Sequence, residues 1–132
     1  MSILFNKIER ANPQNREVKK WYPSLKTVSR VSEKEVAKQI ADETTLNRKE
    51  AEMALDQFQK VLITNLLASN SVKLGDWGSF HLRCKSEGSD AKEAVTAAKI
   101  KSLTLHFTPG KEPQDALKSA SFLPAESLVS GN

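Results

Sequence analysis

A run of apolar residues in the middle of the chain sets the requirements for its core. Between residues 47 and 69 the apolar positions recur at helical spacing, at Ala51, Leu55, Phe58, Leu62 and Leu66. Further apolar residues widen this stripe beyond one helix face, at Met53, Ala54, Val61, Ile63 and Leu67. A chain of 132 residues buries so wide a stripe either against several of its own elements or against a second copy of itself. We expect a dimer core, with packing inside one chain as the alternative.

Local capping patterns predict where the helices begin. Ser32 followed by Glu35 is a capping box, in which a hydroxyl accepts from an unpaired backbone N–H at the helix start. Asn47 followed by Glu50 is a second capping pattern of the same kind, and it precedes the long apolar stripe. We therefore predict one helix from residue 32 to about residue 44, and a second from residue 47 to the polar break at 68–71.

The remaining segments predict strands. Residues 1–28 predict a β-hairpin around the Asn12–Asn15 turn, and residues 72–83 predict two short strands around a tight turn at 75–78. Residues 85–98 are polar and small and show no core pattern. Apolar residues then alternate with polar ones up to Phe107, which predicts another strand, and a short helix is predicted at 111–119. We therefore expect a hairpin extension at 1–30, a domain at 31–119 and a flexible tail at 120–132.

The charge distribution points to a polyanionic partner. The net charge is +4, and the positive residues gather in the predicted strand segments 1–30 and 72–108, whereas 31–71 is mildly acidic. No apolar run approaches the length of a membrane helix, and the first residues do not look like a signal peptide. We expect a cytoplasmic protein with no membrane partner.

The sequence offers no chemistry for catalysis. Cys84 is the single cysteine, so no internal disulfide or cysteine-based metal site is expected. No Walker loop, GxGxxG or GxSxG motif is present. We therefore expect no enzyme activity, no cofactor, no metal and no small-molecule substrate.

Two motifs resemble those of a known family. Residues 72–80 (VKLGDWGSF) look like the strand–turn–strand V-x-L-x-G-F-G-T-F, and residues 107–111 (FTPGK) look like F-x-P-G-K before a last helix. Together with the helix pair at 32–69, they resemble the HU and integration-host-factor family of bacterial nucleoid proteins over about residues 30–118. The additional N-terminal residues resemble the longer HU-like proteins of Bacteroidetes.

This resemblance implies an α+β fold. The expected parts are a helical hairpin, a small antiparallel sheet with an extended β-arm, and a short C-terminal helix, in an intertwined dimer with an added N-terminal β-hairpin. We expect a homodimer, with a heterodimer with a paralogue as the alternative. The dimer core would contain Leu55, Phe58, Leu62, Leu66, Trp77 and Phe80. The implied function is sequence-tolerant binding and compaction of double-stranded DNA in the nucleoid. The arm region lacks the family's arginine-rich run and Arg-Asn-Pro tip, so the wedging proline does not carry over.

Candidate phosphate contacts fall in two groups. Arg83 and Lys85 share a face of the outgoing arm strand by period two, and Lys99 and Lys101 are expected to do so on the return strand. By resemblance, a second group would clamp phosphate on the flank of the dimer: Gly78, Ser79, Gly110 and Lys111. The alternatives are solvated charges at a strand edge for the first group, and turn geometry with an ordinary surface lysine for the second.

The sequence allows alternatives for the role of the hairpin and for the function of the protein. The basic residues of the hairpin, Lys7, Arg16, Lys19 and Lys20, extend the DNA surface, cap the dimer or are plain solvated surface. The alternative function is an HU-fold interaction or scaffold module with weak or no DNA binding. The arm acids Glu87, Asp90 and Glu93 favour that alternative, because they repel phosphate.

Overall fold

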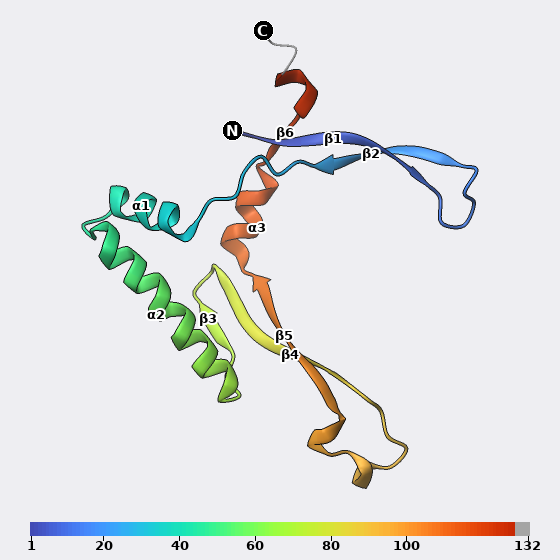
Figure 1. Cartoon of the computed structure of the whole chain (residues 1–132), viewed down its shortest axis with the longest axis vertical. Helices are drawn as coiled ribbons and strands as arrows, with labels where there is room; N and C mark the ends of the chain where they lie inside the picture. Colours follow the sequence, from blue (N-terminus) through green and yellow to red (C-terminus); the bar gives the residue numbers. More distant parts are fainter. Residues whose placement is uncertain (129–132) are drawn as a thin grey trace. The chain divides into compact units, whose positions relative to one another are not determined.

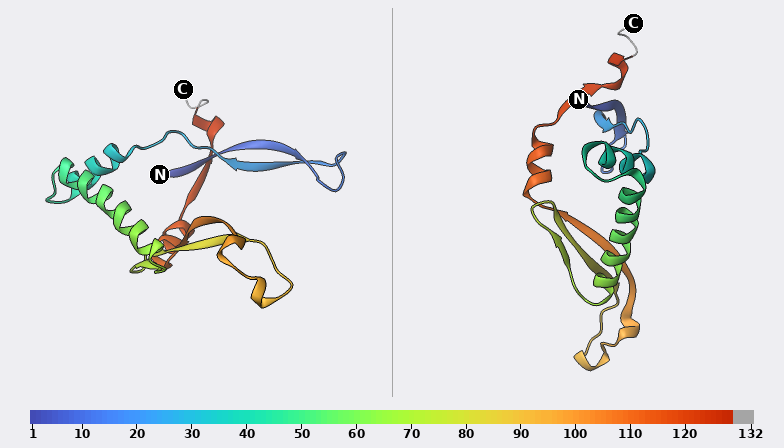
Figure 2. Two further views of the ribbon diagram at one scale, coloured as in Figure 1. Left: turned by 60° about the horizontal axis from the view of Figure 1, so that its bottom comes forward. Right: turned by 90° about the vertical axis from the view of Figure 1, so that its left-hand side faces the viewer.

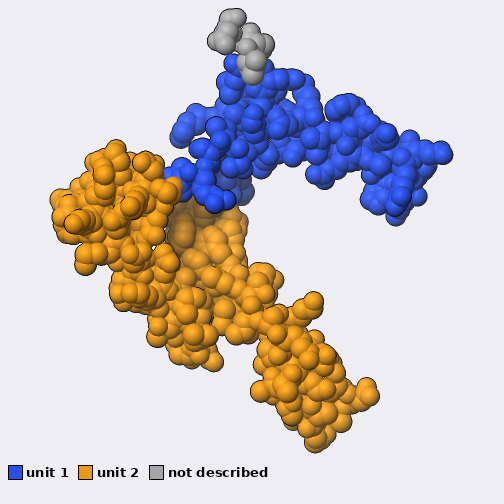
Figure 3. Space-filling view, in the orientation of Figure 1, with its two compact units in different colours: residues 1–31, 117–132 blue, residues 32–116 orange. Residues whose placement is uncertain are grey.

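The structure is a computed structural model that describes residues 1–128. The chain divides into two compact units, which we describe separately (Figure 3). The helix–arm unit is Ser32–Ala116, and the terminal unit combines Met1–Val31 with residues 117–128. The C-terminal segment therefore belongs with the N-terminal hairpin. This division differs from the boundary expected at residue 119.

The helix–arm unit begins with a helical hairpin whose two starts are capped as predicted. Its helices are α1 (Glu33–Glu43) and α2 (Arg48–Leu67) (Figure 1). A third helix, α3 (Lys111–Lys118), begins in this unit and ends two residues past its boundary at Ala116. The Glu35 amide donates to Ser32 Oγ at 3.3 Å, and the Glu50 amide donates to Asn47 Oδ1 at 2.8 Å. Ser69 ends α2 in a left-handed conformation, with φ of 69°.

The sheet of this unit is antiparallel, in the order β3-β4-β5. Its strands are β3 (Val72–Leu74), β4 (Gly78–Ser86) and β5 (Ile100–Pro109), and α2 runs beside β3 (Figures 1 and 2). β4 and β5 extend past β3 as a two-stranded arm, which carries a register shift at Lys85/Ser86. The arm ends in two 3₁₀ turns, Lys92–Ala94 and Ala97–Lys99.

The terminal unit is a three-stranded sheet in the order β2-β1-β6. The predicted hairpin forms from β1 (Ser2–Ala11) and β2 (Lys19–Leu25). The prediction of a flexible tail at 120–132 is wrong for the first part of that range. β6 (Ser121–Pro124) pairs in parallel with β1, and a 3₁₀ turn follows at Ala125–Leu128. The strand is short and its partner lies at the opposite end of the chain, so no local pattern announces it. The rest of the expected tail, residues 129–132, lies outside the described residues.

Few side chains are buried in the described part of a single chain. The buried apolar residues are Ala37, Ala51, Leu62, Leu66 and Ala125, and no large side chain within residues 1–128 is completely enclosed. None of the helices in this part is long and apolar enough to cross a membrane. The same residues contain no cluster of three or more metal-ligating side chains.

Candidate nucleic-acid interface

The β4–β5 ribbon has two chemically different faces. Directly opposed residues of an antiparallel pair point to the same side, so the register assigns each pair to a face. One face is apolar, with the cross-strand pairs Phe80–Phe107, Leu82–Leu105 and Cys84–Leu103. The other face is polar, with Ser79–Thr108, His81–His106, Arg83–Thr104 and Lys85–Ser102. The strict alternation of β4 produces this separation.

The polar face offers only cations and hydrogen-bonding groups. Arg83 and Lys85 are exposed, each directly opposite a hydroxyl side chain, and no ion pair engages either of them within the described chain. Lys73, on β3, pairs with Ser79 and adds a third cation to the same face. Strand residues 79–85 and 102–108 contain no carboxylate. This face is therefore suited to a polyanion.

The chain's two histidines meet on this polar face. His81 and His106 are directly opposed, and their rings stack with centroids 5.9 Å apart and planes 22° from parallel. Both side chains are half-buried. Neither histidine was among the predicted contact residues, although the period-two run Ser79, His81, Arg83 already places His81 beside the candidate contacts.

The return strand does not present its two lysines as predicted. Lys99 belongs to a 3₁₀ turn that precedes β5 and is half-buried. Lys101 lies at the register shift, because Lys85 pairs with Ser102 and Ser86 with Ile100. Its ammonium forms an ion pair of 3.3 Å with Glu87. The prediction that Lys99 and Lys101 share a strand face is therefore wrong, since a bulge interrupts the alternation.

The second candidate group comes together at the other end of the ribbon. Ser79 pairs with Thr108, and the Gly110 amide donates to the carbonyl of Trp77 at 2.9 Å. A β-carbon at Gly110 would contact the carbonyl oxygen of Asp76, and one at Gly78 would lie 2.5 Å from the Phe107 ring. Close backbone packing thus explains both glycines. Lys111 follows directly as the exposed first residue of α3.

Of the residues predicted for the dimer core, the three aromatic ones form a loose cluster with Phe107 in one chain. Leu62 and Leu66 are buried, Leu55, Phe58 and Phe80 are half-buried, and Trp77 remains 46% exposed. The Trp77 ring lies 4.8 Å from Phe107 and 5.8 Å from Phe80, and Phe58 reaches Phe80 edge-on at 6.2 Å. The cluster is continuous with the apolar face of the ribbon, whose Leu103 and Leu105 are also exposed.

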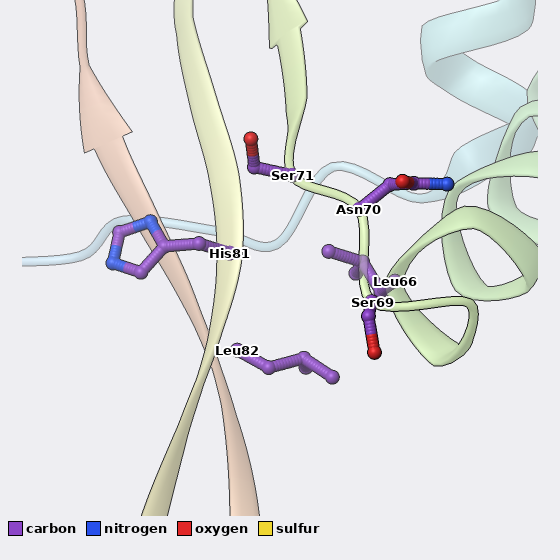
Figure 4. A pocket seen from close by; sticks show the side chains of 6 residues that line it. All are labelled: Leu66, Ser69, Asn70, Ser71, His81 and Leu82. Atoms are coloured by element: carbon purple, nitrogen blue, oxygen red, sulfur yellow. The ribbon is translucent and has the colours of Figure 1, made fainter.

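A cavity of about 310 Å³ lies between the end of α2 and β4. Its lining consists of Leu66, Ser69, Asn70, Ser71, His81 and Leu82 (Figure 4). Leu82 extends toward Leu66, whereas His81 leaves the strand on its other side (Figure 4). The polar part of the lining consists of two serine hydroxyls, the Asn70 amide and the His81 imidazole.

The family model named HU-HIG matches residues 1–124 and describes an HU domain fused to a winged helix–turn–helix, an immunoglobulin or a glycine-rich motif. The chain belongs to the HU-HIG family. The match includes the terminal strands, so the hairpin and β6 are parts of the family's own pattern. The resemblance to HU and integration host factor, inferred from the two motifs, is confirmed.

Individual relatives agree with this assignment. Integration host factor subunit alpha from Xylella fastidiosa strains M12 and Temecula1 is 36% identical over 53 residues, which cover 40% of this chain and 54% of the relative. The chain thus spans about half the length of the curated relatives it matches.

Two solved structures share the fold. A Bacteroides vulgatus protein, described as a candidate bacterial DNA-binding protein, superposes with a TM-score of 0.68 at 14% identity, covering 94% of this chain and 48% of that one. Anabaena HU, crystallised with DNA, superposes with a TM-score of 0.53 at 19% identity, covering 67% of this chain and 98% of HU. The predicted α+β, HU-like fold is confirmed.

Proposed function

We propose that this protein is an architectural DNA-binding protein, which binds the sugar-phosphate backbone of double-stranded DNA as a homodimer with little sequence preference. The observation that carries the proposal is the polar face of the β4–β5 ribbon, where Arg83, Lys85 and Lys73 stand among hydroxyl groups with no carboxylate on the same strands. Arginine, lysine and hydroxyl side chains are the usual contacts to phosphate. The relatives named above are integration host factor and HU, and the latter was crystallised with DNA.

Electrostatics is the expected source of affinity. Each phosphate neutralised by a cation releases counterions, so the logarithm of the binding constant falls by about 0.9 per contact for each tenfold rise in salt. No element of the described chain resembles a helix placed to read base edges, which supports weak sequence preference. We expect dissociation constants of about micromolar at physiological salt, the range typical of non-specific binding.

The second group would add contacts at the base of the ribbon. Ser79 offers a hydroxyl, Lys111 an ammonium, and Gly78 and Gly110 allow the backbone to approach a phosphate closely. The packing of both glycines accounts for their identity without DNA. Ser79 and Lys111 are therefore the members whose replacement bears on binding.

The experiment is a fluorescence anisotropy titration of labelled duplex DNA at two salt concentrations, with the oligomeric state measured alongside. The variant Arg83→Glu/Lys85→Glu should weaken binding by at least tenfold and flatten the salt dependence. The matched control Lys34→Glu/Lys60→Glu makes the same change of charge on the acidic helix pair and should retain most of the affinity. Equal losses in both variants would mean that only net charge matters, and would contradict a role for the ribbon.

One observation favours the alternative of an interaction module. Glu87 already neutralises Lys101 within the arm, so the arm presents fewer free cations than its sequence suggests. A stable dimer of the unchanged chain with no DNA binding even at low salt would support this alternative.

A further inference from the structure

The terminal sheet, like the arm, has two faces that differ in charge. The β1–β2 register assigns Lys7, Glu9 and Trp21 to one face, and Ile8, Arg10, Lys20 and Tyr22 to the other. β6 extends the first face with Phe122, opposite Ile3. We call the first the paired face, because its lysines form ion pairs with carboxylates. We call the second the cationic face, because its cations form none among the described residues.

On the paired face, every strand cation has a carboxylate partner. Lys7 forms an ion pair of 2.8 Å with Glu126, and Lys19 one of 3.9 Å with Glu9. The rest of this face is apolar, where a cavity of about 330 Å³ is lined by Phe5, Pro23, Leu25 and Phe122. Its charge is thus neutralised within the unit.

The cationic face leaves its charge uncompensated. Arg10 and Lys20 are directly opposite one another across the ribbon, and no ion pair within residues 1–128 engages either of them. Like charges in directly opposed positions destabilise a β-ribbon. An anion bound between the two side chains would remove that repulsion.

The neighbours of this cation pair are suited to phosphate. The next pairs along the same face are Ile8–Tyr22 and Asn6–Ser24. Tyr22 lies at the surface, with 44% of the residue exposed. Arginine, lysine, tyrosine, asparagine and serine side chains are all common donors to the DNA backbone.

We propose that the cationic face of the N-terminal ribbon, formed by Arg10, Lys20 and Tyr22, is a second contact surface for the phosphate backbone of duplex DNA. The inference rests on the proposed function and adds a second site, on the terminal unit, to the one proposed on the β4–β5 ribbon. Arg10 did not stand out in the sequence, because only the register shows that it opposes Lys20.

The test compares two neutralised double variants in the full-length chain. Arg10→Gln/Lys20→Gln removes the cationic face, and Lys7→Gln/Lys19→Gln removes the same charge from the paired face of the same ribbon. For the first variant we expect affinity for duplex DNA to fall about tenfold at low salt, and the slope of log affinity against log salt to shrink by about two per chain. The control should change affinity less than twofold, because its cations are already neutralised.

Thermal unfolding without DNA gives an independent readout. Arg10→Gln/Lys20→Gln should keep or raise the unfolding temperature, since it relieves repulsion, whereas Lys7→Gln/Lys19→Gln should lower it slightly. A loss of DNA binding with an unchanged or higher unfolding temperature would therefore support a contact surface rather than a structural role.

The outcomes separate this inference from the proposed function. If Arg83→Glu/Lys85→Glu loses binding while Arg10→Gln/Lys20→Gln does not, the proposal for the cationic face of β1 and β2 is overturned, and the proposal for the β4–β5 arm stands. Equal losses in the Arg10/Lys20 and Lys7/Lys19 variants would also overturn it. If the unchanged chain does not bind DNA, both proposals fail.

Discussion

At the residue scale, Gly110 has the least room for a side chain among the glycines that the structure describes. A β-carbon there would contact the carbonyl oxygen of Asp76 and lie 3.1 Å from the amide nitrogen of Gly78. Both neighbours are backbone atoms of the turn before β4, so they cannot move aside as a flexible side chain would. The Gly110 amide also donates a hydrogen bond of 2.9 Å to the Trp77 carbonyl.

We predict that Gly110→Ala destabilises the protein by about 2 kcal/mol, the size of effect expected for forced backbone displacement. The measurement is chemical denaturation followed by circular dichroism. Gly88→Ala is the control, because a β-carbon at Gly88 would meet nothing within 4 Å. Similar stabilities for the two variants would contradict the crowding at Gly110.

Sequence reasoning identified Gly110 from its motif but could not supply the cause. The atoms that crowd it belong to Asp76 and Gly78, which are distant in the chain. The same limit applies to the cation pairs: period two assigns Arg83 and Lys85 to one face, but only the cross-strand register brings Arg10 opposite Lys20. Residue types are visible in the sequence, whereas partners depend on strand pairing.

At the scale of elements, the structure follows the sequence most closely where the signals are local. The starts of α1 and α2 follow from side chains three residues before the amides they cap. The return strand of the arm was placed less well, because the shift at Lys85/Ser86 changes which residues face the same side. β6 was missed, since its pairing with β1 joins opposite ends of the chain.

The two helices of the hairpin bring carboxylates together. Glu33 of α1 lies near Asp56 and Glu52 of α2. A side-chain hydrogen bond with Asp56, followed by desolvation and by repulsion from Asp56 and Glu52, raises the pKa of Glu33 above its ordinary value of 4.5. The folded state therefore holds this proton more tightly than the unfolded chain does.

The raised pKa predicts how stability changes with pH. As pH rises from 4.5 through the raised pKa of Glu33, the folded state retains more protons than the unfolded state, so this group lowers the free energy of unfolding. Asp56→Asn removes a repulsive charge, and we expect it to raise the unfolding temperature slightly at neutral pH. The gain should shrink as pH falls toward 4.5.

Asp42→Asn is the matched control for this prediction, because Asp42 forms an attractive ion pair of 3.1 Å with Lys38 on α1. Its unfolding temperature should stay level or fall slightly at neutral pH, as expected for an exposed pair. Thermal unfolding at several pH values measures both variants. A gain from Asp56→Asn that does not depend on pH would contradict the role assigned to the carboxylate contact.

At the scale of the whole molecule, the helix–arm unit of one chain buries few apolar side chains. Its buried apolar residues are two alanines and two leucines, whereas Met53, Leu67, Trp77 and Leu103 are all at least 46% exposed. Burial of apolar side chains is the main favourable term in folding. A second copy that covers these residues would complete the core, which agrees with the wide helical stripe in the sequence.

Trp77 allows a direct test of the proposed dimer. It stands beside Phe80 and Phe107 with 46% of its surface exposed in one chain, and Trp21 is the only other tryptophan. In the variant Trp21→Phe, the emission therefore reports on Trp77 alone. We predict blue-shifted emission at high protein concentration and a red shift on dilution, because dissociation returns the indole to water.

Sedimentation should give a mass of twice 14.6 kDa before dilution and a fall toward the monomer mass over the same concentration range. If the emission were independent of concentration and the mass stayed at 14.6 kDa, the exposed aromatic cluster would need another partner, and DNA would be bound by single chains.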